Sequence, residues 1–186
     1  MWSAYKKEKL ESYEEAKRES KLDDDIIPIL EKINEKENYV TISSCSGRIA
    51  VIDLENFGEK LNSEFIGKWH RIVDFEEVLE CVKKCQRQGW LIQYPPIIHV
   101  ACKDLESARK LMKIANDAGF RRSGLISLQN FVVEIASLER LELPVAIDGK
   151  KIVEDNYLRI AVDLANKKLE SGKRKLKRLE IFISSL

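Results

Sequence analysis

The chain has 186 residues, 34% of them charged and 44% hydrophobic, which is long enough for one domain with a proper core. Its formal net charge of +1 excludes a uniformly basic nucleic-acid coat, so any nucleic-acid contact must come from a local patch. No apolar run approaches the roughly 18 residues of a membrane span, and the N-terminus lacks a signal-peptide stretch, so we expect a single cytoplasmic domain over residues 1–186 without membrane contact.

The cysteine and histidine pattern argues against a metal site or a disulfide framework. The four cysteines, Cys45, Cys81, Cys85 and Cys102, include no Cys-x-x-Cys pair, and the chain has only two histidines. We therefore expect no metal ligation.

Two helices are expected before the first strand. Residues 3–21 mix Lys and Glu with few apolar positions, which favours a partly docked helix. The acidic run 23–25 then offers an N-cap for a second helix, in which Pro28 is tolerated because it lies in the first turn. The apolar stripe of this second helix consists of Ile26, Ile29, Leu30 and Ile33.

The hexapeptide Ser43-Ser44-Cys45-Ser46-Gly47-Arg48 lies between two runs that predict strands, so we expect a hairpin connection there. Gly47 alone could supply the positive φ of such a turn. The three hydroxyls, the thiol and the guanidinium exceed this need, and they offer hydrogen bonds to a phosphate, a carboxylate or a ribose. The alternative is a polar turn that contains a buried small thiol.

Residues 66–73 predict a further strand, in which Trp69 and His70 would point to opposite faces. A helix follows, because Phe75, Val78, Leu79, Val82 and Cys85 form a helical stripe. Cys81 and Cys85 lie four residues apart on this helix, and packing explains that spacing more simply than a metal site does.

The next elements are a short strand over 97–102 and a helix through 105–115, with Gly119 as its C-terminal cap. A second hairpin is expected to join residues 120–127 to residues 131–136.

The chain is expected to end in an edge strand and a long helix. Residues 141–147 predict the edge strand, because they contain a proline. The helix spans about 153–183, with an interruption or a cap near Ser171-Gly172. Its inward residues are expected to be Tyr157, Ile160, Ala161, Leu164 and Ala165.

The second half of this helix is basic and is the best candidate for a local nucleic-acid patch, although a solvated helix face is the alternative. Its cations are Lys167, Lys168, Lys173, Arg174, Lys175, Lys177 and Arg178.

Residues 29–53 align without gaps with residues 110–134, although the identity is weak. The alignment indicates an internal duplication of a helix–hairpin–strand unit, with half-repeats over 23–73 and 104–147. Hairpin connections rather than βαβ units predict an α+β fold with a mixed or antiparallel sheet and flanking helices.

Two motifs in different parts of the chain are specific when they occur together: the hexapeptide 43–48 and Gly119-Phe120-Arg121-x-Ser123-Gly124. With them, the chain resembles the tRNA wybutosine-synthesising protein 3 family in its short archaeal form. Asp74 departs from the family pattern, which has a histidine five residues after the matching tryptophan. The other matching positions are Thr41, Trp69, His99-Val100, Cys102, Glu142-x-Pro144, Tyr157 and Asn166.

The resemblance implies methylation, dependent on S-adenosylmethionine, of the N(4) position of a tricyclic wyosine-type base beside the anticodon of phenylalanine tRNA. The chain has no Gly-x-Gly-x-Gly between a strand and a helix, so the donor is not expected to bind as it does in doubly wound folds. The in-line methyl transfer depends mainly on positioning, but the ring nitrogen must also lose a proton. His99 is the candidate catalytic base, with water as the alternative acceptor.

The remaining residues of the resemblance are assigned to binding. For S-adenosylmethionine these are Ser43, Ser44, Cys45, Ser46, Gly47, Arg48, Arg121, Ser123 and Gly124, with a tRNA phosphate as the alternative ligand. Trp69 is expected to stack on the base, with core packing as its alternative, and His99 could equally be a core histidine. The tRNA phosphates are assigned to Lys173, Arg174, Lys175, Lys177 and Arg178. The competing function is a non-catalytic RNA- or nucleotide-binding module.

Overall fold

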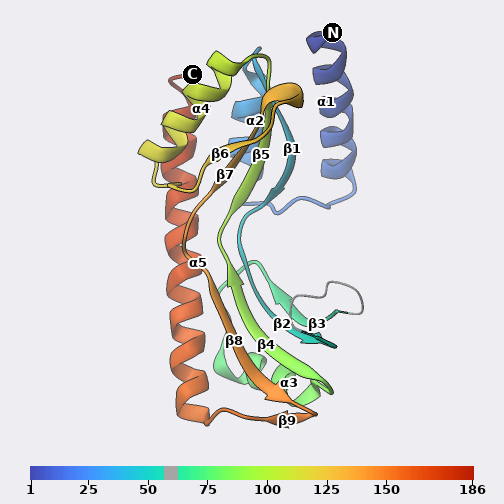
Figure 1. Cartoon of the computed structure of the whole chain (residues 1–186), viewed down its shortest axis with the longest axis vertical. Helices are drawn as coiled ribbons and strands as arrows, with labels where there is room; N and C mark the ends of the chain where they lie inside the picture. The colour runs from blue at the N-terminus through green and yellow to red at the C-terminus, as the bar shows by residue number, and fades with distance from the viewer. Residues whose placement is uncertain (57–62) are drawn as a thin grey trace. The chain divides into compact units, whose positions relative to one another are not determined.

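The computed structural model describes residues 1–56 and 63–186 (Figure 1). Over these residues the chain has five α-helices and two antiparallel sheets, so the expected α+β class is confirmed. The chain forms two compact units. Unit 1 contains Met1–Ser46, Pro96–Leu138 and Gly172–Leu186, and unit 2 contains Gly47–Pro95 and Glu139–Ser171.

Unit 1 is built on a four-stranded sheet in the order β1-β5-β7-β6. One face of this sheet packs against α2, α4 and the last part of α5, through residues such as Ile33, Ile98, Leu111 and Leu179. The other face is partly covered by α1 (Figure 1). The elements are α1 (Trp2–Arg18), α2 (Ile27–Glu35), β1 (Tyr39–Cys45), β5 (Ile97–Cys102), α4 (Leu105–Asp117), β6 (Gly124–Ser127), a 3₁₀ turn (Gln129–Phe131) and β7 (Val132–Ala136).

Unit 2 is built on a five-stranded sheet in the order β3-β2-β4-β8-β9. One face packs against α3 and the first part of α5, through residues such as Ile49, Leu91, Val78 and Leu158. The elements are β2 (Arg48–Leu54), β3 (Glu64–Trp69), α3 (Phe75–Lys84), β4 (Gln88–Tyr94), β8 (Leu141–Ile147), β9 (Lys150–Lys151) and the residues of α5 (Asp155–Ile183) up to Ser171.

The predicted hairpin at the hexapeptide is wrong. β1 pairs with β5, whereas β2 pairs with β3 and β4, so the strands on either side of the hexapeptide belong to different sheets. The chain passes from unit 1 to unit 2 between Ser46 and Gly47. The predicted repeat therefore lacks its hairpin in the first half, and both half-repeats, 23–73 and 104–147, are divided between the two units. The second predicted hairpin is confirmed, because β6 pairs with β7.

Other strand predictions need smaller corrections. The strand predicted over 66–73 ends at Trp69, and His70 lies in the following loop. Strand β4, between β2 and β8, was not predicted at all. Pro144 of β8 pairs with Trp90 of β4 on one side. On the other side, β9 pairs only with two later residues of β8. Pro144 therefore has a strand partner on one side only, as a proline at a sheet edge requires.

Helix α5 runs for 29 residues without the interruption that was predicted near Ser171-Gly172. Its buried residues in unit 2 are Leu158, Ala161, Val162, Ala165 and Leu169. Tyr157, Ile160 and Leu164 were expected to point inward but are 48%, 60% and 45% exposed, because the buried stripe is shifted around the helix. Among the described residues, no helix combines the length and the apolar character that a bilayer crossing requires.

Gly172 lies inside α5 because Pro96 occupies the space that a side chain would need. A Cβ atom at Gly172 would lie 2.5 Å from Cδ of Pro96. We expect Gly172→Ala to destabilise the protein, since overpacking costs about 1–3 kcal/mol and the better helix propensity of alanine returns only about 1 kcal/mol. The melting temperature measures the effect, and Ser171→Ala on the same helix is the control. A Gly172→Ala protein that melts at a higher temperature than the wild type would contradict the steric role.

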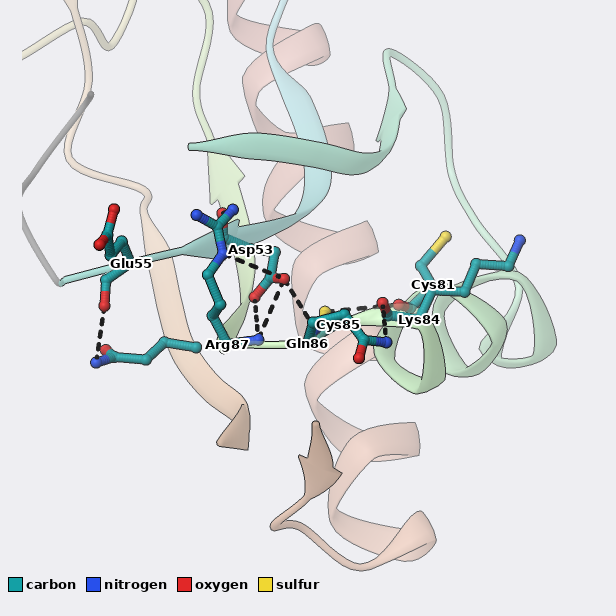
Figure 2. Close-up of polar contacts among 8 residues, drawn as sticks. Asp53, Glu55, Cys81, Lys84, Cys85, Gln86 and Arg87 are labelled. Carbon is teal, nitrogen blue, oxygen red and sulfur yellow. Dashed lines mark hydrogen bonds and ion pairs between the residues drawn. The ribbon is translucent and has the colours of Figure 1, made fainter. Parts of the chain in front are cut away.

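Asp53 organises the loop between α3 and β4 in unit 2 (Figure 2). Its carboxylate is 2% exposed and accepts hydrogen bonds from the backbone N–H groups of Gln86 and Arg87, at 2.8 and 3.1 Å. The guanidinium Nε of Arg87 lies 3.7 Å from the same carboxylate. The loop that leads into β4 is therefore fixed by one buried acid.

Cys81 and Cys85 pack in the core of unit 2, as predicted. The Cys85 thiol points back to the carbonyl oxygen of Cys81, as Figure 2 shows. Burial raises the pKa of Cys85 to about 12, and the thiolate that nucleophilic chemistry or metal binding would require is disfavoured there.

Candidate functional site

Three polar side chains form a row across the sheet of unit 1. Ser43 on β1 is the register partner of His99 on β5, and His99 is the partner of Glu134 on β7. Glu134 in turn faces Gly124 on β6. Directly paired residues of antiparallel strands project from the same face, so the sheet pairing brings these residues together.

The row is continuously hydrogen-bonded. Oγ of Ser43 lies 2.6 Å from Nδ1 of His99, and Nε2 of His99 lies 2.9 Å from Oε2 of Glu134. An ionised carboxylate only accepts, so Nε2–H donates to Glu134. In the neutral imidazole, Nδ1 is then the acceptor for the Ser43 hydroxyl. The arrangement is a carboxylate–imidazole–hydroxyl relay.

The row lies on the face of the sheet opposite the main core. Ile98 and Val100 flank His99 in sequence and are fully buried in that core, whereas the His99 side chain is 25% exposed. His99 therefore lies outside the main core and is partly exposed. Ser43 is exposed and stands at the β1 end of the row.

The hexapeptide contributes separately to each unit, with Ser43–Ser46 in unit 1 and Gly47 and Arg48 in unit 2. The hydroxyl-bearing residues Ser43 and Ser44 line a cavity of about 90 Å³ between β1 and α1, together with Thr41 and Ile42. Gly47 has φ of 91°, so the prediction that it supplies a positive φ is confirmed.

Ser46 is fully buried and is hydrogen-bonded to residues of unit 1. Its backbone N–H donates to Oδ2 of Asp23 at 2.7 Å, and its hydroxyl accepts from Nζ of Lys173 at 2.7 Å. Lys173 also forms an ion pair with Asp25. The acidic run 23–25 therefore binds the hexapeptide and α5 rather than capping α2, whose N-cap is Ile26. In this structure both Ser46 and Lys173 are engaged with one another and with the acidic run, and the ligand contacts predicted for them stay predictions.

The second motif shapes the turn that enters β6. Gly119 has φ of 104° after α4, which confirms its capping role. The Ser123 hydroxyl donates to the carbonyl oxygen of Phe120 at 2.7 Å and so closes the turn. Arg121 is exposed on this turn. The aliphatic part of Lys175 lies against Gly119, since a Cβ there would be 3.4 Å from its Cε.

Several other residues that carry the family resemblance have structural roles. Thr41 is buried and donates to Oδ1 of Asn34, and burial raises the pKa of Cys102 to about 12. Asn166 on α5 accepts from the backbone N–H of Val73 and donates to its carbonyl oxygen, at 3.0 and 2.8 Å. Asp74 is the N-cap of α3.

Trp69 packs on the core side of the unit 2 sheet. It pairs with Ile49, and its ring covers Gly67, where a Cβ atom would lie 2.3 Å from the indole. This position matches the core-packing alternative for Trp69. His70, in the loop after β3, has Nδ1 3.0 Å from the carbonyl oxygen of Gly47.

Glu134 was missed by the sequence reasoning. One feature of the sequence pointed to Glu134. It is the one charged residue in the apolar run Val132-Val133-Glu134-Ile135-Ala136, which forms β7. Three exposed cations of α5 in unit 1 remain candidates for phosphate contacts: Arg174, Lys177 and Arg178.

The chain is an α+β protein with a hydrogen-bonded row of polar side chains across an antiparallel sheet, which is distinct from a doubly wound nucleotide-binding fold. The family model described as Methyltransferase TYW3 matches residues 4–185. The chain belongs to this methyltransferase family, as the sequence motifs indicated.

Individual relatives agree with this assignment. A protein from Archaeoglobus fulgidus is 56% identical over 100% of this chain and 95% of its own length; it is named tRNA(Phe) 7-((3-amino-3-carboxypropyl)-4-demethylwyosine(37)-N(4))-methyltransferase. A protein from Pyrococcus abyssi with the same activity in its name is 46% identical over 97% of this chain and 95% of its own. A solved structure from Pyrococcus horikoshii has a TM-score of 0.94 at 46% identity, covering 97% of this chain and 95% of that one.

Proposed function

We propose that this protein transfers a methyl group from S-adenosylmethionine to the N(4) position of a wyosine-type base in phenylalanine tRNA. The names of the relatives from Archaeoglobus fulgidus and Pyrococcus abyssi state N(4)-methylation of a 4-demethylwyosine derivative at position 37 for those proteins. The observation in this chain that supports the same chemistry is the Ser43–His99–Glu134 row, because N-methylation of a ring N–H needs a proton acceptor.

The chemistry of the unit 1 residues fits the methyl donor. The Ser44 hydroxyl and the exposed Arg121 guanidinium suit the ribose hydroxyls and the carboxylate of S-adenosylmethionine, and the Glu134 carboxylate suits its positive charge. Gly124 leaves open space beside Glu134, since a Cβ there would meet nothing within 4 Å. The cavity beside Ser44, at about 90 Å³, is smaller than the roughly 300–1,000 Å³ of ligand pockets and does not hold the donor by itself.

S-adenosylmethionine supplies an electrophilic methyl group, which is transferred when the bond from carbon to sulfur breaks and a bond from carbon to N(4) forms. Ser43 Oγ takes the proton that N(4) loses and passes its own proton to Nδ1 of His99. Glu134 stabilises the imidazolium through its hydrogen bond to Nε2 and keeps the ring oriented. His99 thus acts through Ser43, because both of its ring nitrogens are already engaged.

The anticodon loop of phenylalanine tRNA is the proposed partner. Its base beside the anticodon is unpaired, so exposing it costs less than extruding a base from a duplex. Arg174, Lys177 and Arg178 on α5 are proposed to contact the phosphates of the same tRNA.

The direct experiment is incubation of the protein with S-adenosylmethionine and phenylalanine tRNA that carries the 4-demethyl base, followed by mass analysis of the nucleoside. We expect the mass of one added methyl group on the tricyclic base. S-adenosylmethionine alone should raise the melting temperature, because a ligand that binds only the folded state stabilises it. An unmodified nucleoside under conditions in which the donor binds would refute the proposed function and favour the non-catalytic RNA-binding module.

A further inference from the structure

The face of the unit 2 sheet opposite the core cluster carries a group of aromatic rings and cations. Strand alternation sends Ile49, Val51 and Leu91 into the core against α3 and α5, and it sends Arg48 and Tyr94 to the other face. We call this second face the outer face and define it by Arg48, Phe65, Lys68, Tyr94 and Arg140.

The five side chains of the outer face are linked by four cation–ring contacts. The Arg48 guanidinium lies 5.4 Å from the Phe65 ring centre and 5.8 Å from that of Tyr94. Lys68 Nζ lies 5.7 Å from the ring centre of Phe65, and the Arg140 guanidinium lies 4.7 Å from that of Tyr94. The result is an alternating series of aromatic rings and cations.

This series is accessible and carries uncompensated charge. Phe65 is 48% exposed and the Arg140 side chain 49% exposed. Arg140 pairs with Glu142, but within the described part of the chain Arg48 and Lys68 have neither an ion pair nor a side-chain hydrogen bond. The buried Nε of Arg48 has no hydrogen-bond partner either. Arg48 and Lys68 therefore lie beside the exposed Phe65 ring without an ion-pair partner among the described residues.

We infer that the outer face binds a single-stranded stretch of RNA, with bases stacked on Phe65 and the neighbouring guanidinium planes and phosphates held by Arg48 and Lys68. Single-stranded RNA is recognised by stacking on aromatic and arginine planes displayed on antiparallel sheets, together with backbone charge. An acidic peptide would use the cations but would not require the aromatic rings. The inference rests on the proposed function for its ligand, the anticodon loop of the substrate tRNA.

The test measures binding of unmethylated phenylalanine tRNA to the full chain at several salt concentrations. Phe65→Ala should weaken binding about tenfold, because stacking of one base is lost. Lys68→Gln should reduce the slope of log affinity against log salt by about 0.7, the value for one phosphate contact with a single strand. The controls are Ile160→Ala, which removes an exposed apolar side chain from α5, and Lys84→Gln, which removes a charge from α3; neither should change binding.

The two proposals fail in different ways. If the wild type methylates the tRNA but Phe65→Ala and Lys68→Gln bind it as the wild type does, the outer face is not an RNA site and the proposed function stands. If the wild type does not methylate the tRNA, the proposed function fails. Melting temperatures close to that of the wild type separate a loss of binding from a loss of folding.

Discussion

His99→Ala is expected to lower kcat for methyl transfer by about 10²-fold or more, the usual contribution of a positioned general base. The substitution removes the middle member of the Ser43–His99–Glu134 row, so the Ser43 hydroxyl loses the group that receives its proton. Single-turnover methylation with both substrates saturating measures the chemical step directly. The melting temperature should change little, because His99 lies outside the main core.

Substitutions along the row should behave as one unit. Ser43→Ala should lower kcat by a similar factor, and Ser43→Thr, which keeps a hydroxyl on a strand position, should restore much of it. Combining Ser43→Ala with His99→Ala should cost little more than either alone, since residues that act together are strongly non-additive. Glu134→Gln should have a smaller effect, because it keeps a hydrogen-bond acceptor for Nε2 but loses the negative charge.

The control for these variants is His70→Ala, which removes the other histidine from a loop of unit 2. It should retain kcat. If His99→Ala raised the KM for the methyl donor while kcat stayed unchanged, His99 would be a binding residue, and the relay would be wrong. Full additivity of the Ser43 and His99 substitutions would also contradict a shared proton path.

The elements whose signals are local were predictable from the sequence. Helices α3 and α4 follow from their apolar periodicity and α1 from its Lys- and Glu-rich composition. Gly119 ends α4 with the positive φ expected of a capping glycine. The pairing of β6 with β7 was also predictable, because a short turn joins two apolar runs.

The pairing at the hexapeptide was not predictable by the same rule. Two apolar runs separated by a glycine-containing turn have the same local sequence pattern in two cases. The two strands can pair with each other, or each can pair with a distant strand. The true partner of β1 is β5, more than fifty residues later. Local sequence carries no information on this choice, which depends on how two sheets fill their cores.

The Ser43–His99–Glu134 row shows the same limit of local sequence information. The sequence singled out Ser43 and His99 separately, the first as a ligand contact and the second as a base. Their 2.6 Å contact, and the addition of Glu134, depend on the register of β1, β5 and β7. Lys173 is a further example, because its contacts with Asp25 and Ser46 join residues more than one hundred positions apart and have no local sequence signal.

Asp53→Ala is expected to lower the stability of the protein more than Gly172→Ala does. It removes the acceptor for the backbone N–H groups of Gln86 and Arg87 and leaves the Arg87 guanidinium without its carboxylate (Figure 2). A donor left without a partner in a buried site costs about 1–3 kcal/mol, so the free energy of unfolding should fall by about 2–4 kcal/mol. Denaturant unfolding measures this change.

Asp53→Asn should cost less than Asp53→Ala, because the amide oxygen still accepts one of the two backbone hydrogen bonds. The control is Asp163→Ala, which removes an exposed carboxylate from α5 in the same unit and should change the free energy of unfolding by less than about 0.5 kcal/mol. Equal stabilities of Asp53→Ala and Asp163→Ala would show that the loop after α3 does not depend on the buried acid. If Asp53→Ala lowers the free energy of unfolding more than Asp53→Asn does, the stabilisation comes from the hydrogen bonds that position β4 between β2 and β8.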